Sequence, residues 1–126
     1  METLKEGVVM ESILTSIKKL LGVTKDDTHF DSDIIIHINS VFTILKRLGV
    51  GPVNGFRIED ESAVWTDFIP EEHTDFESVK TYVYQKVKLI FDPPQSSAHM
   101  EALKESIREF EWSLQTAAEL IEEEVT

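Results

Sequence analysis

Residues 76–112 read FESVKTYVYQKVKLIFDPPQSSAHMEALKESIREFEW, and this stretch decides the fold. Its first part has the apolar spacing of a helix that ends at Phe91. Pro93 and Pro94 cannot lie inside a helix, because neither ring nitrogen can donate a hydrogen bond and each ring clashes with the preceding turn. A second, longer helix begins near Ser96. We therefore expect a stiff structural corner at the two prolines, with a long helical arm leaving it.

Both of these helices have one apolar face. Thr74 and Glu77 have the spacing of a capping box, which predicts that the first helix begins just after Thr74. Ser96 or Ser97 caps the second helix. The first face consists of Phe76, Val79, Val83, Val87 and Ile90, with Tyr82, Lys86 and Leu89 beside it. The second face repeats at spacings of four and three through Leu103, Ile107, Phe110, Leu114, Ala117 or Ala118, and Ile121.

The helix after the prolines is too long for a body of this size. From Ser97 to about Glu122 it would span roughly 39 Å at a rise of about 1.5 Å per residue. A compact chain of 126 residues has a diameter of roughly 36 Å. The C-terminal part of this helix is therefore expected to overhang the body. Its apolar face beyond Leu114 then needs a partner, whereas residues 122–126 are expected to form a frayed acidic tail.

Two further helices are predicted upstream. The first covers residues 11–21 and ends at Gly22, after two lysines in its last turn. The second covers residues 32–48 and ends at Gly49. The apolar face of the first consists of Ile13, Ile17, Leu20 and Leu21. The second carries the widest apolar stripe, expected at the centre of the core: Ile34, Ile35, Ile38, Val41, Phe42, Leu45 and Leu48.

The segment that joins the two halves is less clearly patterned. Residues 49–56 are rich in turn-forming residues, and their glycines superficially resemble a phosphate loop. That segment follows a helix, lacks the lysine and opens no helix, so we expect no nucleotide site there. Residues 56–69 alternate weakly, which is compatible with a short β-hairpin around residues 56–66 or with a single helical turn. The pattern leaves both alternatives open.

Composition indicates one globular domain over residues 1–126, mainly α, built as a small bundle of about four helices. Hydrophobic residues at 41% and charged residues at 29% are typical of folded rather than disordered chains. No apolar run approaches the roughly 20 residues that span a bilayer. The acidic start lacks the features of a signal peptide, and residues 1–10 are expected to be flexible. There are no cysteines, which suits folding in a reducing cytoplasm.

The charge is strongly negative and unevenly placed. The chain carries 12 basic and 24 acidic residues, a net charge of −12. Residues 1–63 have a net charge of −3 and residues 64–126 a net charge of −9. A surface of this kind repels phosphate backbones, which disfavours ordinary nucleic-acid binding. It indicates either simple solubility or a surface that lies near nucleic acid without adhering to it.

The sequence contains no recognisable catalytic motif, so we expect no enzymatic activity and no cofactor. It lacks a serine elbow, a cysteine nucleophile and a phosphate-binding lysine loop. The acidic residues cluster in solvated runs rather than in apolar surroundings that would raise a carboxyl pKa. Asp33 and His37 are four residues apart on a helix and could share a metal, but no third ligand has a recognisable spacing. We expect no metal site.

Two tryptophans raise the question of a protein interface. Trp112 lies about 200° from Phe110 around the helix, away from its apolar face, and an indole in that position is typical of an interface anchor. A helix buried on both faces is the alternative. Trp65 has the same ambiguity, with apolar neighbours that favour packing. The candidate interface residues are Trp65, Phe110, Trp112, Leu114 and Ile121.

Several segments together carry a family resemblance that covers most of the chain. The chain resembles the small phage head-tail connector, or adaptor, proteins of phages and prophages of Gram-positive bacteria. LIFDPP is the most specific of the segments. They are residues 17–22 (IKKLLG), 31–42 (DSDIIIHINSVF), 48–52 (LGVGP), 65–68 (WTDF), 77–83 (ESVKTYV), 89–94 (LIFDPP) and 109–112 (EFEW).

The resemblance implies a structural virion protein that acts at the head-tail interface. Its members are mainly helical subunits that form a homo-oligomeric ring below the portal, complete the head and extend the DNA channel toward the tail. The implied partners are other copies of the chain, the portal protein and a tail-side connector or stopper. Genomic DNA would pass through without specific binding, and an acidic lumen would lower its friction. No membrane is involved.

Two other classes of function remain compatible with the residues. One is an acidic DNA-mimic inhibitor, whose carboxylates would occupy the DNA groove of another protein. Such a protein needs acids spaced along one face and no self-assembly. The other is a small helical regulator that binds a partner through its last helix. Neither explains the proline corner as well as a connector does.

Overall fold

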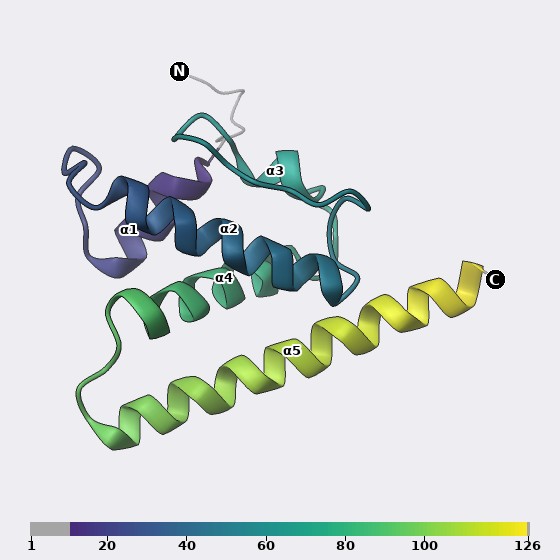
Figure 1. Ribbon diagram of the computed structural model, residues 1–126. Coiled ribbons are helices and arrows are strands. Elements are labelled where there is room, and N and C mark those ends of the chain that lie inside the picture. Colours follow the sequence, from purple (N-terminus) through teal and green to yellow (C-terminus); the bar gives the residue numbers. More distant parts are fainter. Residues whose placement is uncertain (1–10, 126) are drawn as a thin grey trace.

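The computed structural model describes residues 11–125, with side chains through residue 121 (Figure 1). The predicted flexible segment, residues 1–10, lies outside the described residues. The described residues form four substantial helices and one short one, which confirms a mainly helical fold. They are α1 (Ile13–Leu21), α2 (Asp31–Arg47), α3 (Trp65–Phe68), α4 (Phe76–Phe91) and α5 (Ser97–Val125).

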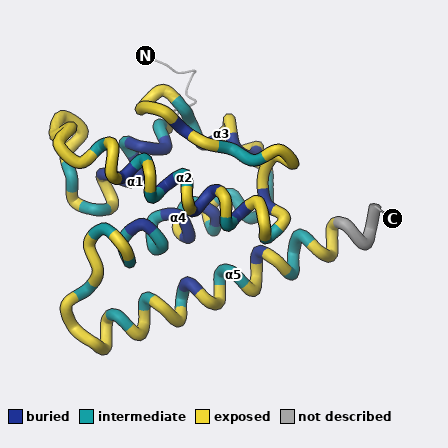
Figure 2. Tube along the Cα trace, viewed as in Figure 1, coloured by how far each residue is buried: buried dark blue, intermediate teal, exposed yellow. Residues whose placement is uncertain are grey.

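Helix α2 lies at the centre of the core, as its wide apolar stripe predicted. It packs against α1 and α4, and α4 in turn packs against α5. The buried residues lie on the faces where these helices meet (Figure 2). The apolar core consists of Ile13, Leu14, Ile17, Ile34, Ile38, Val41, Phe42, Leu45, Val50, Ile58, Trp65, Phe68, Ile69, Val79, Tyr82, Val83, Val87, Ile107 and Leu114.

Helix α1 has the predicted end but a different apolar face. Gly22 adopts a left-handed conformation at φ 84° and closes the helix, as glycine does readily without a Cβ. Ser12 caps the start, where its hydroxyl accepts a 3.2 Å hydrogen bond from the Thr15 backbone N–H. The prediction for Leu20 was wrong, because its side chain is 53% exposed while Leu14 is buried instead.

A buried lysine links α1 to α2, which the sequence did not reveal. Lys18 is only 2% exposed, although lysines in a last helical turn are usually solvated. Its ammonium lies 2.8 Å from an Asp31 carboxylate oxygen and donates a 3.1 Å hydrogen bond to the Lys25 carbonyl. These two partners satisfy a charge that would otherwise be costly to bury.

The segment between α2 and α4 contains a helical turn rather than a hairpin. Over residues 11–125 no strand forms, and the only extended pairing is a bridge between Ser12 and Val64. The hairpin alternative for residues 56–66 is therefore wrong. The reason is tertiary: the Asn39 side chain accepts a 2.7 Å hydrogen bond from the Ile58 N–H and donates a 2.9 Å bond to its carbonyl. The Asn39 amide holds this segment against α2, so the segment does not fold back to pair with itself as a hairpin.

Helix α4 ends at Phe91, as predicted, but its N-cap and one residue of its apolar face differ from the prediction. Its N-cap is Asp75, with no side-chain hydrogen bond, so the predicted capping box of Thr74 and Glu77 does not form. The preceding turn sets the start one residue later, since the Asp75 N–H donates to His73 Nδ1 at 3.0 Å. At the other end Ile90 is 55% exposed, and the prediction that it lies on the buried face was wrong.

The corner at Pro93 and Pro94 reverses the chain, so that α5 runs back alongside α4 (Figure 1). The Ser96 hydroxyl accepts a 3.2 Å hydrogen bond from the His99 N–H, which confirms a cap at the predicted position. Helix α5 then extends past the other helices at its C-terminal end (Figure 1), as its length predicted. It continues to Val125 and includes most of the segment that we expected to fray.

Candidate protein-interaction surface

The C-terminal half of α5 exposes large apolar side chains. Trp112 is 71% exposed, Leu120 57% and Ile121 52%. A tryptophan exposed to solvent is often one of the few residues that contribute most of the binding energy at a protein interface. Trp112 lies on the side of α5 opposite Ile121, at 100° per residue. The C-terminal half of α5 therefore presents apolar groups in more than one direction.

The inner face of α5 is held on α4 by a polar cluster around Glu111. The Tyr82 hydroxyl donates a 2.7 Å hydrogen bond to the Glu111 carboxylate, and the Lys86 ammonium lies 3.6 Å from the same oxygen. Burial, followed by the hydrogen bond to Glu111, raises the pKa of Tyr82 well above its ordinary value. The phenol therefore stays a proton donor, and α5 is positioned by a contact that only this alignment of the two helices allows.

The structure separates the five candidate interface residues into three groups by their exposure. Trp65 and Leu114 are buried within the chain, at 2% and 1% exposure, so no partner reaches them in this fold. The Trp65 indole N–H donates a 2.9 Å hydrogen bond to the Ser16 hydroxyl, which explains how its polar group tolerates burial. Phe110 is half-buried. Trp112 and Ile121 are exposed and remain candidates for contact.

A groove of about 370 Å³ lies beside the overhang. It is bounded by the loop after α2, by the segment that follows α3 and by the C-terminal half of α5. Most of its wall is apolar, and Ile121 lies along it. The residues that line it are Gly49, Val50, Gly51, Pro52, Phe68, Ile69, Pro70, His73, Asp75, Leu114, Ala118 and Ile121.

Sequence reasoning missed four exposed apolar side chains: Phe30, Ile36, Val53 and Ile90. A signal for Ile36 was present, because three successive isoleucines on one helix cannot all face the core. No comparable signal existed for Phe30, whose ring meets the ring of Phe91 edge-on at 5.4 Å. That contact joins the start of α2 to the end of α4, immediately before the proline corner.

The corner itself is accessible. Pro93 is exposed and Pro94 is half-buried, so the corner lies on the surface rather than in the core. The chain enters it from Phe91, whose ring is partly buried against the core. A rigid, exposed turn of this kind sets the direction of α5 without contributing much to the core.

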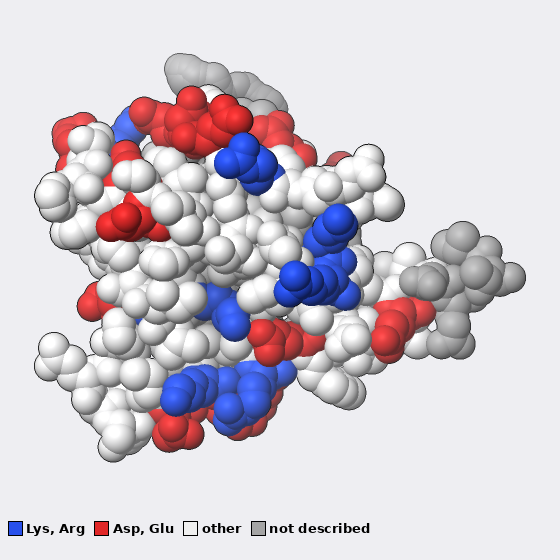
Figure 3. Space-filling view, in the orientation of Figure 1, with Lys and Arg blue, Asp and Glu red and all other residues white. Residues whose placement is uncertain are grey.

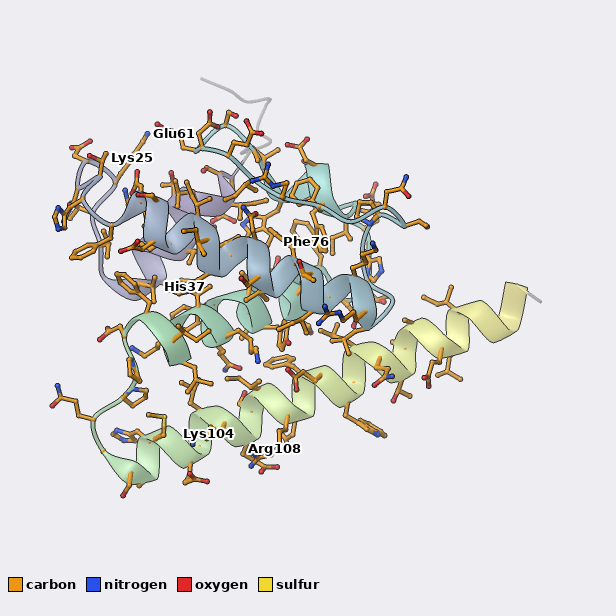
Figure 4. The ribbon with its side chains drawn as sticks, viewed as in Figure 1. Lys25, His37, Glu61, Phe76, Lys104 and Arg108 are labelled. Carbon is orange, nitrogen blue, oxygen red and sulfur yellow. The ribbon has the colours of Figure 1, made fainter. Side chains whose placement is uncertain are left out.

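The face shown in Figure 3 carries both basic and acidic patches. Basic side chains gather over the C-terminal half of α2, and an acidic band lies over the segment before α3 (Figure 3). Over the first half of α5, basic and acidic side chains lie together (Figure 3). The acidic segment before α3 contains Glu59, Asp60 and Glu61, and Glu61 lies on the loop at the edge of the molecule (Figure 4).

Within the described residues, no three histidine, aspartate or glutamate side chains gather to hold a metal ion. None of the described helices is long and apolar enough to cross a bilayer.

The architecture so far is that of a small helical body with a rigid corner and an overhanging helix that bears unpartnered apolar groups. A family model described as phage connector protein matches residues 13–120 of the chain, from α1 to the overhang. The chain belongs to the phage connector protein family. This confirms the resemblance drawn from the sequence. No curated protein and no solved structure is significantly similar to this connector. Membership supports a structural role in the phage particle.

Proposed function

We propose that this connector forms a ring between the portal and the tail, where it completes the head and extends the DNA channel. The observation that carries the proposal is α5, a 29-residue helix that extends past its own body (Figure 1). Its exposed Trp112 and Leu120 have no apolar neighbour to cover them in the described chain. An amphipathic helix in this position is suited to docking on another subunit.

Ring formation from one kind of chain sets a geometric requirement. Each subunit needs two different, complementary surfaces, because a head-to-tail contact closes into a ring only by rotation. The overhang of α5 supplies one surface. Candidates for the second surface are the exposed apolar and basic groups elsewhere on the body. The two open ends of such a ring would contact the portal protein and a tail-side connector or stopper.

The net charge of −12 suits a ring through which DNA moves. Carboxylates that face the lumen repel phosphate oxygens, so DNA slides without forming lasting contacts. A lumen rich in lysine and arginine would instead retain the DNA through released counterions. The proposal therefore includes passage of the genome without sequence-specific binding.

The test is assembly on the portal. Purified connector mixed with portal should give rings by negative-stain electron microscopy and multimers by mass photometry. A variant truncated after Glu119 should keep its thermal melt but assemble poorly, because the described side chains that it loses, Leu120 and Ile121, are exposed. A control variant with Glu101→Ala, an exposed residue at the other end of α5, should assemble normally. Monomers alone, even with portal in excess, would rule out the ring.

A further inference from the structure

A second groove, of about 350 Å³, lies between α2 and the segment that precedes α3. It is bounded by the C-terminal half of α2 and by residues 54–57, and its walls carry Lys46 and Arg57 and no carboxylate. The rings of Phe42 and Phe56 lie at its base and meet edge-on, with their centroids 5.2 Å apart. We call it the cationic groove; its lining residues are Asn39, Phe42, Thr43, Lys46, Asn54, Gly55, Phe56 and Arg57.

The cations of this groove are weakly neutralised by their own chain. Among the described side chains, Lys46 has no carboxylate within ion-pair distance, and Arg57 pairs only with exposed Glu59 at 3.4 Å. Arg47, the next residue on α2, is exposed as well. On a protein with a net charge of −12, a groove with two cations and an apolar base is a local exception. It fits a segment that combines acidic and apolar side chains.

The end of α5 is such a segment. Residues 119–124 read ELIEEE, and the last turn of the helix contains no basic residue. The C-terminus of a helix carries a partial negative charge, so glutamates there are electrostatically unfavourable unless cations approach from elsewhere. This end also extends past the body (Figure 1). In its own chain α5 lines the other groove through Ile121, and none of its described residues borders the cationic groove.

We propose that the acidic end of α5 in one copy docks in the cationic groove of the neighbouring copy. This acidic end would approach Lys46 and Arg57, and exposed Leu120 would contact the apolar base. The ion pairs would set orientation and association rate more than affinity. The contact joins two different surfaces of the same chain, which is the kind that closes into a ring by rotation. The inference rests on the proposed ring and names the contact that builds it.

Charge reversal tests the contact without portal. The groove variant Lys46→Glu with Arg57→Glu and the tail variant Glu122→Lys, Glu123→Lys, Glu124→Lys should each weaken self-association at least tenfold in sedimentation velocity. An equimolar mixture of the two variants should associate again, because each supplies what the other lost. The matched control is Lys104→Glu with Arg108→Glu, two exposed cations on the first half of α5 (Figure 4). It changes the net charge by the same amount and should associate like the wild type.

A cross-link gives a direct readout that does not depend on loss of assembly. Because the chain has no cysteine, Asn54→Cys and Leu120→Cys can be made in separate copies and mixed under oxidising conditions. A disulfide-linked heterodimer is expected, and mixing Asn54→Cys with Ala102→Cys, on the first half of α5, should give none. Equal yields from the two mixtures would overturn the contact.

The two proposals fail in different ways. If the wild type forms rings on the portal and both charge-reversed variants form them equally well, the contact is wrong and the ring stands. If the wild type forms no ring on the portal, the ring and the contact are both wrong. If the groove variant assembles normally while the tail variant fails, α5 docks on a different surface and the contact with the cationic groove is overturned.

Discussion

The Tyr82 hydroxyl of α4 donates a 2.7 Å hydrogen bond to the Glu111 carboxylate of α5. This contact sets how α5 lies along α4, because it forms at only one register of the two helices. The Gln85 side chain accepts a 3.0 Å hydrogen bond from the Ser106 hydroxyl on the same seam. The direction of the overhang therefore depends on a polar seam as well as on Ile107 and Leu114, which are buried below it.

Replacement of Tyr82 by Phe should lower the free energy of unfolding by about 1–2 kcal/mol, the usual loss for a hydrogen bond to a half-buried charged group. Urea denaturation at pH 8 measures this loss, and Tyr84→Phe is the matched control.

The pKa of Tyr82 is raised in the folded protein by burial and by Glu111. This stabilisation is complete below the ordinary pKa of about 10 and is lost as the pH rises above it. The wild type should therefore lose stability more steeply than Tyr82→Phe between pH 9 and about pH 11. Parallel curves would show that the phenol does not carry the effect.

Substitution of Gly51 by Ala should be far more damaging than the same change at Gly22. Both glycines are left-handed, with φ of 93° and 84°, which costs alanine about 1 kcal/mol. A Cβ at Gly22 meets nothing within 4 Å, whereas a Cβ at Gly51 would overlap the buried Phe68 ring. We expect a loss of about 1 kcal/mol for Gly22→Ala and about 3 kcal/mol for Gly51→Ala. Thermal melts of the two variants decide the point, and equal losses would contradict the close approach.

Replacement of both Pro93 and Pro94 by Ala should misdirect α5 without unfolding the domain. Pro93 is exposed and neither ring belongs to the core, so the melt should change little. Without the prolines, α4 can continue as a helix, and α5 would leave the body at variable angles. Particles that carry this variant should package DNA but join tails poorly. Normal tail attachment would show that the corner has no geometric role.

Replacement of Trp112 by Ala should leave stability within about 0.5 kcal/mol of the wild type, as expected for an exposed side chain. Trp65→Ala should lose about 3–5 kcal/mol, because that indole is buried and hydrogen-bonded to Ser16. If Trp112 contacts a neighbouring subunit or the portal, its loss should weaken assembly at least tenfold at unchanged melting temperature. Unchanged assembly would place the interface elsewhere on α5.

The local pattern was sufficient to predict the helices. Apolar spacing predicted α1, α2, α4 and α5, and most of the predicted helix ends lie within two residues of the observed ones. This succeeded because amphipathic periodicity and helix caps are local properties. The proline corner and the overhang also followed from the sequence, since proline geometry and the rise of a helix do not depend on context. The family resemblance arose from the same segments and was confirmed over residues 13–120.

The tertiary structure decided which side chains face water and where the irregular segments lie. Lys18 is buried because Asp31 comes within 2.8 Å of it, and no local pattern announces a partner 13 residues away. Residues 56–66 do not pair as a hairpin because Asn39, on α2, binds the backbone of Ile58. Trp65 and Trp112 look equally suited to an interface in the sequence, yet one is buried and the other exposed. These outcomes depend on contacts between residues far apart in the chain, so periodicity and propensity alone could not determine them.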